Sequence, residues 1–192
     1  MPRIRPVDPQ SAPPEIREAH EKALRRFGRV TNMKATLLHS LPAFDALMTW
    51  YDLRETVQPF LGERLTDLFS HAISAGTDCL ICSTYFRRAL IDAGINPDEL
   101  VLDEREQVVV EFGRCLAKPF SRVPDELYAR LSALFTDEEV VTLTAFGAMM
   151  VATNVVNNAL EVELDEYLTE YHKGAADPAT SNRRVEDDRG SS

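Results

Sequence analysis

The sequence is poor in features that define several large classes of protein. Three of its 192 residues are cysteine, too few and odd in number for the disulfide framework of a small secreted domain. Lys and Arg number 21 against 31 Asp and Glu, and the net charge of -10 argues against nucleic-acid binding, which needs a basic surface. We find no uninterrupted apolar run long enough to cross a bilayer. Met1–Pro6 lacks the apolar segment of a secretory signal, so we expect a cytoplasmic protein without membrane or nucleic-acid partners.

What the sequence does contain is a series of helical patterns. Its length and its 44% hydrophobic content suit one domain whose core needs no metal or disulfide. The patterns, bounded by Pro, Gly and capping residues, run over Pro13–Phe27, Met33–Ser40, Pro42–Val57, Gly62–Ala75, from Thr77 or Asp78 to Ala93, Asp103–Leu116, Pro124–Phe135, and from a capping box at Thr136 to about Tyr171. We predict an all-α domain over residues 1–173 and a disordered polar tail at 174–192.

The most informative motif is the pair Cys79 and Cys82 at the start of a predicted helix. Positions i and i+3 share a helix face with Cβ atoms roughly 5–6 Å apart. A disulfide tolerates Cα separations of about 4.4–6.8 Å, so we expect the pair to bridge and open without large backbone movement. A helix N-terminus favours the thiolate and lowers a cysteine pKa, whereas the charge of Asp78 opposes this effect. The alternative is two small apolar residues in a packed helix. Structural zinc is disfavoured because Cys115, on another predicted helix, leaves the ligand set incomplete. We therefore predict a reversible redox pair with no metal and no cofactor.

Asp67 and His71 are four residues apart on the preceding predicted helix and so share a face. A carboxylate that orients an imidazole, which then takes a thiol proton, is a common catalytic arrangement. The alternative is an ordinary helix ion pair worth about 0.2–0.5 kcal/mol. Asp67 and His71 are thus candidate catalytic residues beside the cysteine pair.

Several stretches together resemble the alkyl hydroperoxidase D-like, or carboxymuconolactone decarboxylase-like, family. They are Pro13–Arg17, Arg26–Asn32, His39–Pro42, Cys79–Cys82, Thr136–Leu143 and Asn154–Leu160. The resemblance covers roughly residues 10–168, and the cysteine motif is its most specific part. It implies an all-α helix bundle that assembles as a homo-oligomer, commonly a trimer or larger.

The resemblance also implies roles for single residues. Cys82 would attack the peroxide and Cys79 would then close the disulfide, while a glutamate and a histidine of the family relay a proton. At the matching positions this sequence has Asp67 and Phe86. Phe86 cannot accept a proton, so either the peroxidase activity is weak or His71 has taken over as the base.

The leading functional prediction is a thiol-dependent peroxidase or disulfide reductase. It would act on a small peroxide or disulfide and be regenerated by a dithiol reductant protein. Two alternatives stay open: a redox-sensing oligomer with little or no activity, favoured by Phe86, and a cofactor-free decarboxylase, disfavoured by the cysteine pair.

Two further groups of residues allow more than one interpretation. Asn154, Asn157 and Asn158 share a face of an apolar helix, either lining a pocket near the cysteines or serving as buried amides. Trp50 and Tyr51 follow an apolar stripe that predicts packing in the core or between subunits.

Overall fold

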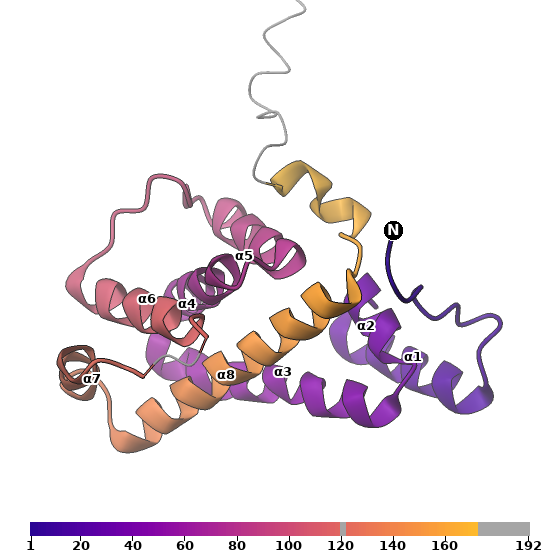
Figure 1. Cartoon of the computed structure of the whole chain (residues 1–192), viewed down its shortest axis with the longest axis horizontal. Coiled ribbons are helices and arrows are strands. Elements are labelled where there is room, and N and C mark those ends of the chain that lie inside the picture. The colour runs from indigo at the N-terminus through magenta and orange to yellow at the C-terminus, as the bar shows by residue number, and fades with distance from the viewer. Residues whose placement is uncertain (120–121, 173–192) are drawn as a thin grey trace, which may run out of the picture.

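The computed structural model describes residues 1–119 and 122–172, and all regular structure in that part of the chain is helical (Figure 1). The elements are α1 (Pro14–Phe27), α2 (Asn32–Leu37), α3 (Leu41–Leu61), α4 (Glu63–Gly76), α5 (Leu80–Asp92), α6 (Glu104–Leu116), α7 (Asp125–Ser132), α8 (Asp137–Leu160) and the 3-10 helix η1 (Glu166–Tyr171). The all-α prediction is therefore confirmed. The predicted tail at 174–192 lies outside the described residues.

Local sequence signals set most helix boundaries as predicted. Gly28 closes α1 with a left-handed backbone, φ 71°. Thr136 and Glu139 form the predicted capping box at the start of α8, in which each side chain meets the other residue's backbone N–H. Asp103 and Glu106 form a second capping box at the start of α6. These caps supply partners for backbone donors that the helices cannot satisfy internally.

Several helix ends differ from the prediction, and α2 and α7 each end three residues early, at Leu37 and Ser132. The helix predicted to end near Val57 continues through Pro59 to Leu61, and Gly62, with φ 80°, then turns the chain into α4. The pattern predicted to run to Tyr171 is interrupted after Leu160, where Glu161 adopts a left-handed backbone with φ 49°. This break lets the chain fold back as η1, which packs against α5.

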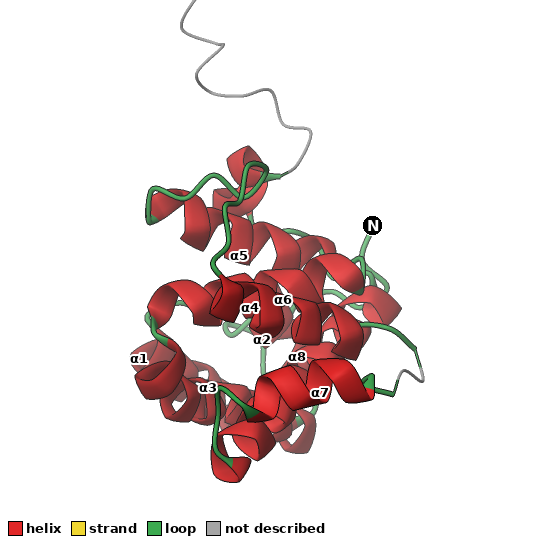
Figure 2. Cartoon of the chain, turned by 90° about the vertical axis from the view of Figure 1, so that its left-hand side faces the viewer, coloured by secondary structure: helices red, strands yellow, loops and turns green. Residues whose placement is uncertain are grey.

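The long helices α3 and α8 lie against each other, and α4 packs on α5, α6 and α8 (Figure 1). Figure 2 shows the same helices from the side, with α5 at the top, α4 and α6 below it, and α3 beneath. The centre is aromatic, with the Phe69 ring 6.1 Å from that of Phe112 and 6.0 Å from that of Phe146. The absence of a side chain at Gly147 allows α8 to pack closely here, because a Cβ atom would lie 2.5 Å from Leu116 Cδ1 and 3.0 Å from Phe69 Cζ.

α8 also has one surface property that the search for apolar runs did not predict. The helix has 24 residues and includes an 18-residue segment with a mean hydropathy of 1.5, so by length and composition alone it could cross a membrane, although 39% of that segment is buried inside the protein. The rest of the helix exposes Val141 and Val155 together with alanines between them. The buried face of α8 packs on α3 and α4, which is the arrangement expected of a core helix.

Candidate functional site

The two cysteines lie at the turn between α4 and α5. Asp78 has a left-handed backbone with φ 52°, and the extended Cys79 then precedes Leu80, the first residue of α5. The prediction that Thr77 or Asp78 caps this helix is wrong, because Cys79 itself occupies the cap position. The Thr77 hydroxyl instead donates back to the Ile73 and Ser74 carbonyls of α4, at 3.0 and 3.2 Å. Cys82 is consequently the third residue of α5, one turn from Cys79.

An asparagine of α8 connects the two sulfurs. Both cysteines are buried and reduced. The Asn157 side-chain amide donates to Cys82 Sγ at 3.3 Å and to Cys79 Sγ at 3.8 Å. Asn157 is a buried amide that contacts the sulfurs and is not part of the cavity lining described below, a role in the site that neither interpretation of the asparagine face assigned to it.

The other two asparagines hold the turn rather than the sulfurs. Asn154 donates to the Thr77 hydroxyl at 2.7 Å, and Asn158 donates to the Thr77 carbonyl at 2.9 Å. These bonds join α8 to the α4–α5 turn from both sides of Asn157. The position of the cysteine pair is therefore fixed by α8 as well as by its own helix.

The surroundings of the pair favour one negative charge and resist a second. The pKa of Cys79 is lowered from an ordinary value of 9.0 to about 7. The Cys82 side chain contributes most, with further contributions from the backbone N–H groups of Cys82 and Ile81 and from the Asn157 amide, while burial opposes them. The pKa of Cys82 is raised by the Cys79 side chain and by complete burial. The pair thus holds one proton between two sulfurs near neutral pH.

A cavity of about 580 Å³ opens beside Cys82. Cys82 is part of its lining and Cys79 is not. Its lining includes many aromatic rings and methionines, among them Phe27, Met33, Met48, Trp50, Tyr51, Tyr85, Phe86 and Met150. Phe86, which stands where the resemblance implied a histidine, packs with its ring 6.0 Å from that of Trp50. A small molecule in this cavity would meet Cys82 against an apolar, aromatic wall.

Three polar groups in the cavity wall lack ordinary partners. Lys34 of α2 is 4% exposed, and its Nζ lies over the rings of Phe27 and Tyr51, at 4.6 and 5.0 Å from their centroids. Burial lowers the pKa of Lys34 to about 8, against an upward effect of Asp165. Trp50 Nε1 and Asp165 Oδ2 are buried and have no hydrogen-bond partner among residues 1–119 and 122–172. No sequence pattern predicted this cluster, because its members come from α2, α3 and the segment before η1.

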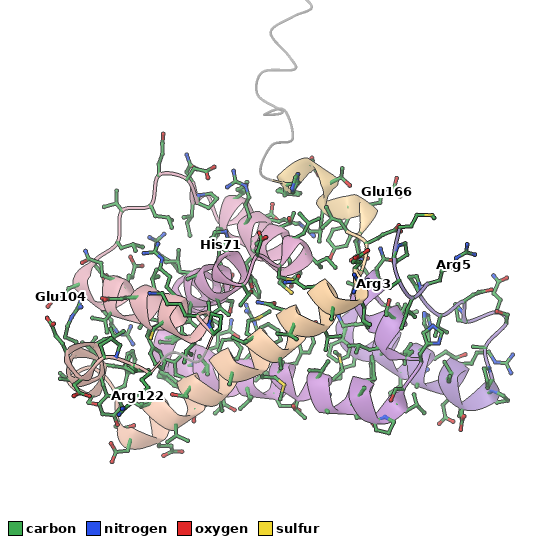
Figure 3. The ribbon with its side chains drawn as sticks, in the orientation of Figure 1. Arg3, Arg5, His71, Glu104, Arg122 and Glu166 are labelled. Carbon is green, nitrogen blue, oxygen red and sulfur yellow. The ribbon has the colours of Figure 1, made fainter. Side chains whose placement is uncertain are left out.

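Asp67 and His71 both lie on α4 (Figure 3 labels His71), but the partner of Asp67 comes from another helix. Asp67 Oδ1 accepts a hydrogen bond from Arg54 Nη1 of α3 at 3.0 Å. Burial raises the pKa of Asp67, and Arg54 opposes the shift. Neither Asp67 nor His71 belongs to the described lining of the cavity beside Cys82.

Comparison with known proteins gives the fold. No family model matches the chain, and no curated protein matches it. Among solved structures, it is similar to the alkylhydroperoxidase D core of an uncharacterized peroxidase-related protein from Ralstonia eutropha, with a TM-score of 0.71 and 19% identity over 88% of this chain and 95% of that one.

Two more solved structures are informative. One is a debrominase, with a TM-score of 0.70 and 14% identity over 88% of this chain and 95% of that one. A cysteine-to-alanine variant of that debrominase has been solved in complex with 2,3,4-tribromopyrrole. The other is a putative antioxidant defence protein from Agrobacterium tumefaciens, with a TM-score of 0.59 and 20% identity over 66% of this chain and 93% of that one. The chain therefore has the all-α alkyl hydroperoxidase D-like fold that its sequence resemblance implied.

Proposed function

We propose that the protein is a thiol-dependent reductase, of the peroxidase or disulfide reductase type, in which Cys79 and Cys82 cycle between two thiols and a disulfide. The observation that carries the proposal is the Asn157 amide, which donates to both sulfurs of a buried, reduced pair. A donor shared by two sulfurs stabilises a thiolate on either of them. Cys82 is the sulfur that lines the cavity, so it is the one that meets the substrate.

With a hydroperoxide, the Cys82 thiolate attacks the terminal peroxide oxygen and the O–O bond breaks. The departing alkoxide takes up the proton that Cys79 received from Cys82, which gives the alcohol and restores the Cys79 thiolate. Cys82 is then a sulfenic acid. The Cys79 thiolate attacks its sulfur, the S–S bond forms, and hydroxide leaves as water after protonation. Two thiols are oxidised and one peroxide is reduced.

The proton of Cys82 needs an acceptor because Phe86 cannot serve as one. Cys79, with a pKa of about 7, is the acceptor nearest to Cys82, and the Cys82 side chain is the main cause of its lowered pKa. Transfer of the proton from Cys82 to Cys79 generates the attacking thiolate without a histidine. The alternative base is His71 oriented by Asp67, as the sequence suggested.

The remaining steps involve partners. A dithiol reductant protein would attack the disulfide and restore both thiols. Assembly as a homo-oligomer, a trimer or larger, is supported by the exposed apolar residues of α8, which a second copy would cover. Light scattering on the purified protein measures the assembly directly. The reducing cytoplasm is the compartment in which such a pair would cycle.

The test compares Cys82→Ser with Cys79→Ser. We expect hydrogen peroxide to oxidise both thiols of the wild type to an intramolecular disulfide. Cys79→Ser should accumulate a sulfenic acid on Cys82, trapped with dimedone and located by mass spectrometry, and Cys82→Ser should give no peroxide-dependent product on Cys79. A wild-type pair that stays reduced under peroxide at every accessible pH would overturn the proposal and favour a non-enzymatic role.

A second candidate reaction is reductive dehalogenation of a small aromatic compound. The aromatic cavity wall beside Cys82 favours it, because flat rings stack well on such walls, and a debrominase shares the fold. In this reaction the aromatic carbon gains a proton in place of the halogen, the halide leaves, and the two thiols supply two electrons as they form the disulfide. Release of bromide from 2,3,4-tribromopyrrole by the reduced wild type, but not by Cys82→Ser, tests it.

A further inference from the structure

Three buried polar groups converge on the cavity beside Cys82 from different parts of the chain. They are Lys34, Trp50 and Asp165, which are 4%, 8% and 9% exposed. We propose that this cavity binds a small organic carboxylate with an aromatic body, and that the carboxylate pairs with Lys34. The inference rests on the proposed function and deepens it, since it names the chemical class of the substrate.

Lys34 has no ion-pair partner in the described part of the chain. An ammonium group removed from water is costly unless a charge or hydrogen-bond acceptor faces it. Among the described residues no carboxylate oxygen lies within 4.0 Å of Lys34 Nζ, and its printed contacts are the ring faces of Phe27 and Tyr51. A cation above an aromatic ring gains about 0.5–2 kcal/mol, less than a paired carboxylate would supply. The wall of the cavity thus contains a cation that has no carboxylate in direct ion-pair contact, although Asp165 acts on it from beyond 4.0 Å.

The lining of the cavity as a whole contains more cations than carboxylates. The chain carries a net charge of -10, yet its cavity is lined by four cationic side chains and two carboxylates. The cations are Arg26, Arg29, Lys34 and Arg88, and the carboxylates are Glu55 and Asp165. A concave, cationic site on an acidic protein concentrates small anions from solution. The arrangement favours an anionic ligand over a neutral or cationic one.

The remaining wall of the cavity suits an aromatic ligand. The rings of Tyr51, Tyr85 and Phe86 and a volume of about 580 Å³ fit a small aromatic body. Tyr51 contacts Lys34 Nζ at 5.0 Å from its ring centroid and lines the same cavity as Cys82. A ligand held at Lys34 would therefore extend along Tyr51 toward the reactive sulfur.

Trp50 and Asp165 complete the polar end. Trp50 Nε1 is a donor without a partner in the described part of the chain, so it can give a hydrogen bond to a ligand oxygen. Asp165, which also lines the cavity, accepts a hydrogen bond at Oδ1 from the backbone N–H of Asn32 at 2.9 Å, and its buried Oδ2 has no partner in the described part of the chain. Because Asp165 is beyond ion-pair distance from Lys34, a hydroxyl or water bound between them would satisfy both.

The experiment compares carboxylates with their neutral amides in the reduced wild-type protein. Trp50 is the single tryptophan of the chain and lines the cavity, so its fluorescence reports occupancy directly. The probes are benzoate with benzamide and phenylacetate with phenylacetamide, titrated at neutral pH and repeated by calorimetry. We expect at least one carboxylate to bind about tenfold more tightly than its amide, the ratio that about 1.4 kcal/mol of charge pairing gives.

Two variants locate the preference. Lys34→Met should bind carboxylate and amide equally, while Lys22→Met, at an exposed lysine of α1, should keep the wild-type preference. If Lys34→Met does not fold, chemical acetylation of the wild type replaces this variant. Bound phenylacetate should then protect Lys34, but not Lys22, from the acetylating reagent. Equal binding of carboxylate and amide by the wild type, absence of carboxylate binding at millimolar concentration, or a preference retained without Lys34 would each overturn the inference.

The binding measurement is independent of thiol chemistry. A carboxylate preference together with a pair that never oxidises would overturn the proposed function and leave the ligand class standing. Peroxide-dependent oxidation without any carboxylate preference would overturn the ligand class and leave the proposed function standing.

Discussion

Two helices flank the cysteine pair, and their polar faces behave differently. The face of α4 carries Asp67 and His71, the face of α8 carries three asparagines, and both sets were recognised from spacing along one helix. On α8, Asn157 contacts the two sulfurs and its neighbours hold the turn that carries them. On α4, Asp67 is paired with Arg54 of α3.

The difference shows what spacing along a helix can and cannot predict. Residues at i and i+4 share a face, and this holds for both helices. Which helix then approaches that face depends on how the bundle packs. Asp67 meets Arg54 because α3 lies against α4, whereas Asn157 meets the sulfurs because α8 passes the start of α5. We therefore expect the thiol chemistry to depend on α8 far more than on α4.

The largest effect that tests this comparison is the pH dependence of the thiol reaction. The thiolate is the reactive form, and the pKa of Cys79 is about 7. From about pH 5 to pH 8 the rate with hydrogen peroxide should rise nearly a hundredfold and then level off, because a group of this pKa is almost fully ionised at the upper limit. Stopped-flow measurement of thiol loss gives the profile.

The rate rises with pH because the thiolate, not the thiol, reacts with peroxide. A lowered cysteine pKa means that reactivity is present above the folded pKa and is lost as the pH falls through it. A cysteine with the ordinary pKa of 9.0 would titrate about two pH units higher. A rate that continues to climb with a midpoint at that value would mean that neither α5 nor α8 stabilises the thiolate.

The next effect in size is that of Asn157→Leu, which removes the amide and keeps the side chain's volume. A hydrogen bond to a charged group contributes about 1.5–3 kcal/mol, and one pKa unit corresponds to about 1.4 kcal/mol. We expect the thiolate pKa to rise by about one unit and the peroxide rate at neutral pH to fall about tenfold. Ultraviolet absorbance of the thiolate during a pH titration measures the shift.

Asn154→Leu is the matched control for this variant. Asn154 lies one turn earlier on α8, is also buried, and donates to Thr77 rather than to sulfur. It should lower the thermal stability and leave the thiolate pKa in place. Equal pKa shifts in the two variants would indicate that the asparagines act through the turn and not through the sulfurs.

The sequence predicted the architecture better than the site. Helices bounded by Gly28, Asp103 and Thr136 are determined by a few neighbouring residues, so local signals locate them. The cysteine pair was equally visible because its members are three residues apart. Lys34, Trp50 and Asp165 were not, because they meet through contacts between α2, α3 and the segment that follows the break at Glu161. Periodicity indicates that a residue is buried without indicating what it faces.

A smaller effect, on stability alone, is expected for Asp67→Asn. The change removes the charge that pairs with the partly buried Arg54 guanidinium. We expect a loss of about 1–3 kcal/mol in the free energy of unfolding, the range for a buried polar group that loses its partner. The peroxide rate should stay unchanged at neutral pH. A tenfold slower reaction in a folded Asp67→Asn protein would indicate that α4 contributes to the thiol chemistry.

The smallest effect is expected for His71→Ala, the variant that addresses the alternative base directly. If His71 takes the Cys82 proton, its removal should raise the thiolate pKa and slow peroxide reduction at least tenfold, within the range for general-base catalysis. If Cys79 is the acceptor, the rate should change less than about twofold, because His71 is not among the residues described around the cavity. Comparing the full pH profiles of the wild type, His71→Ala and Asn157→Leu separates the two bases. A midpoint that moves in Asn157→Leu and stays near 7 in His71→Ala assigns the control of the thiolate to α8.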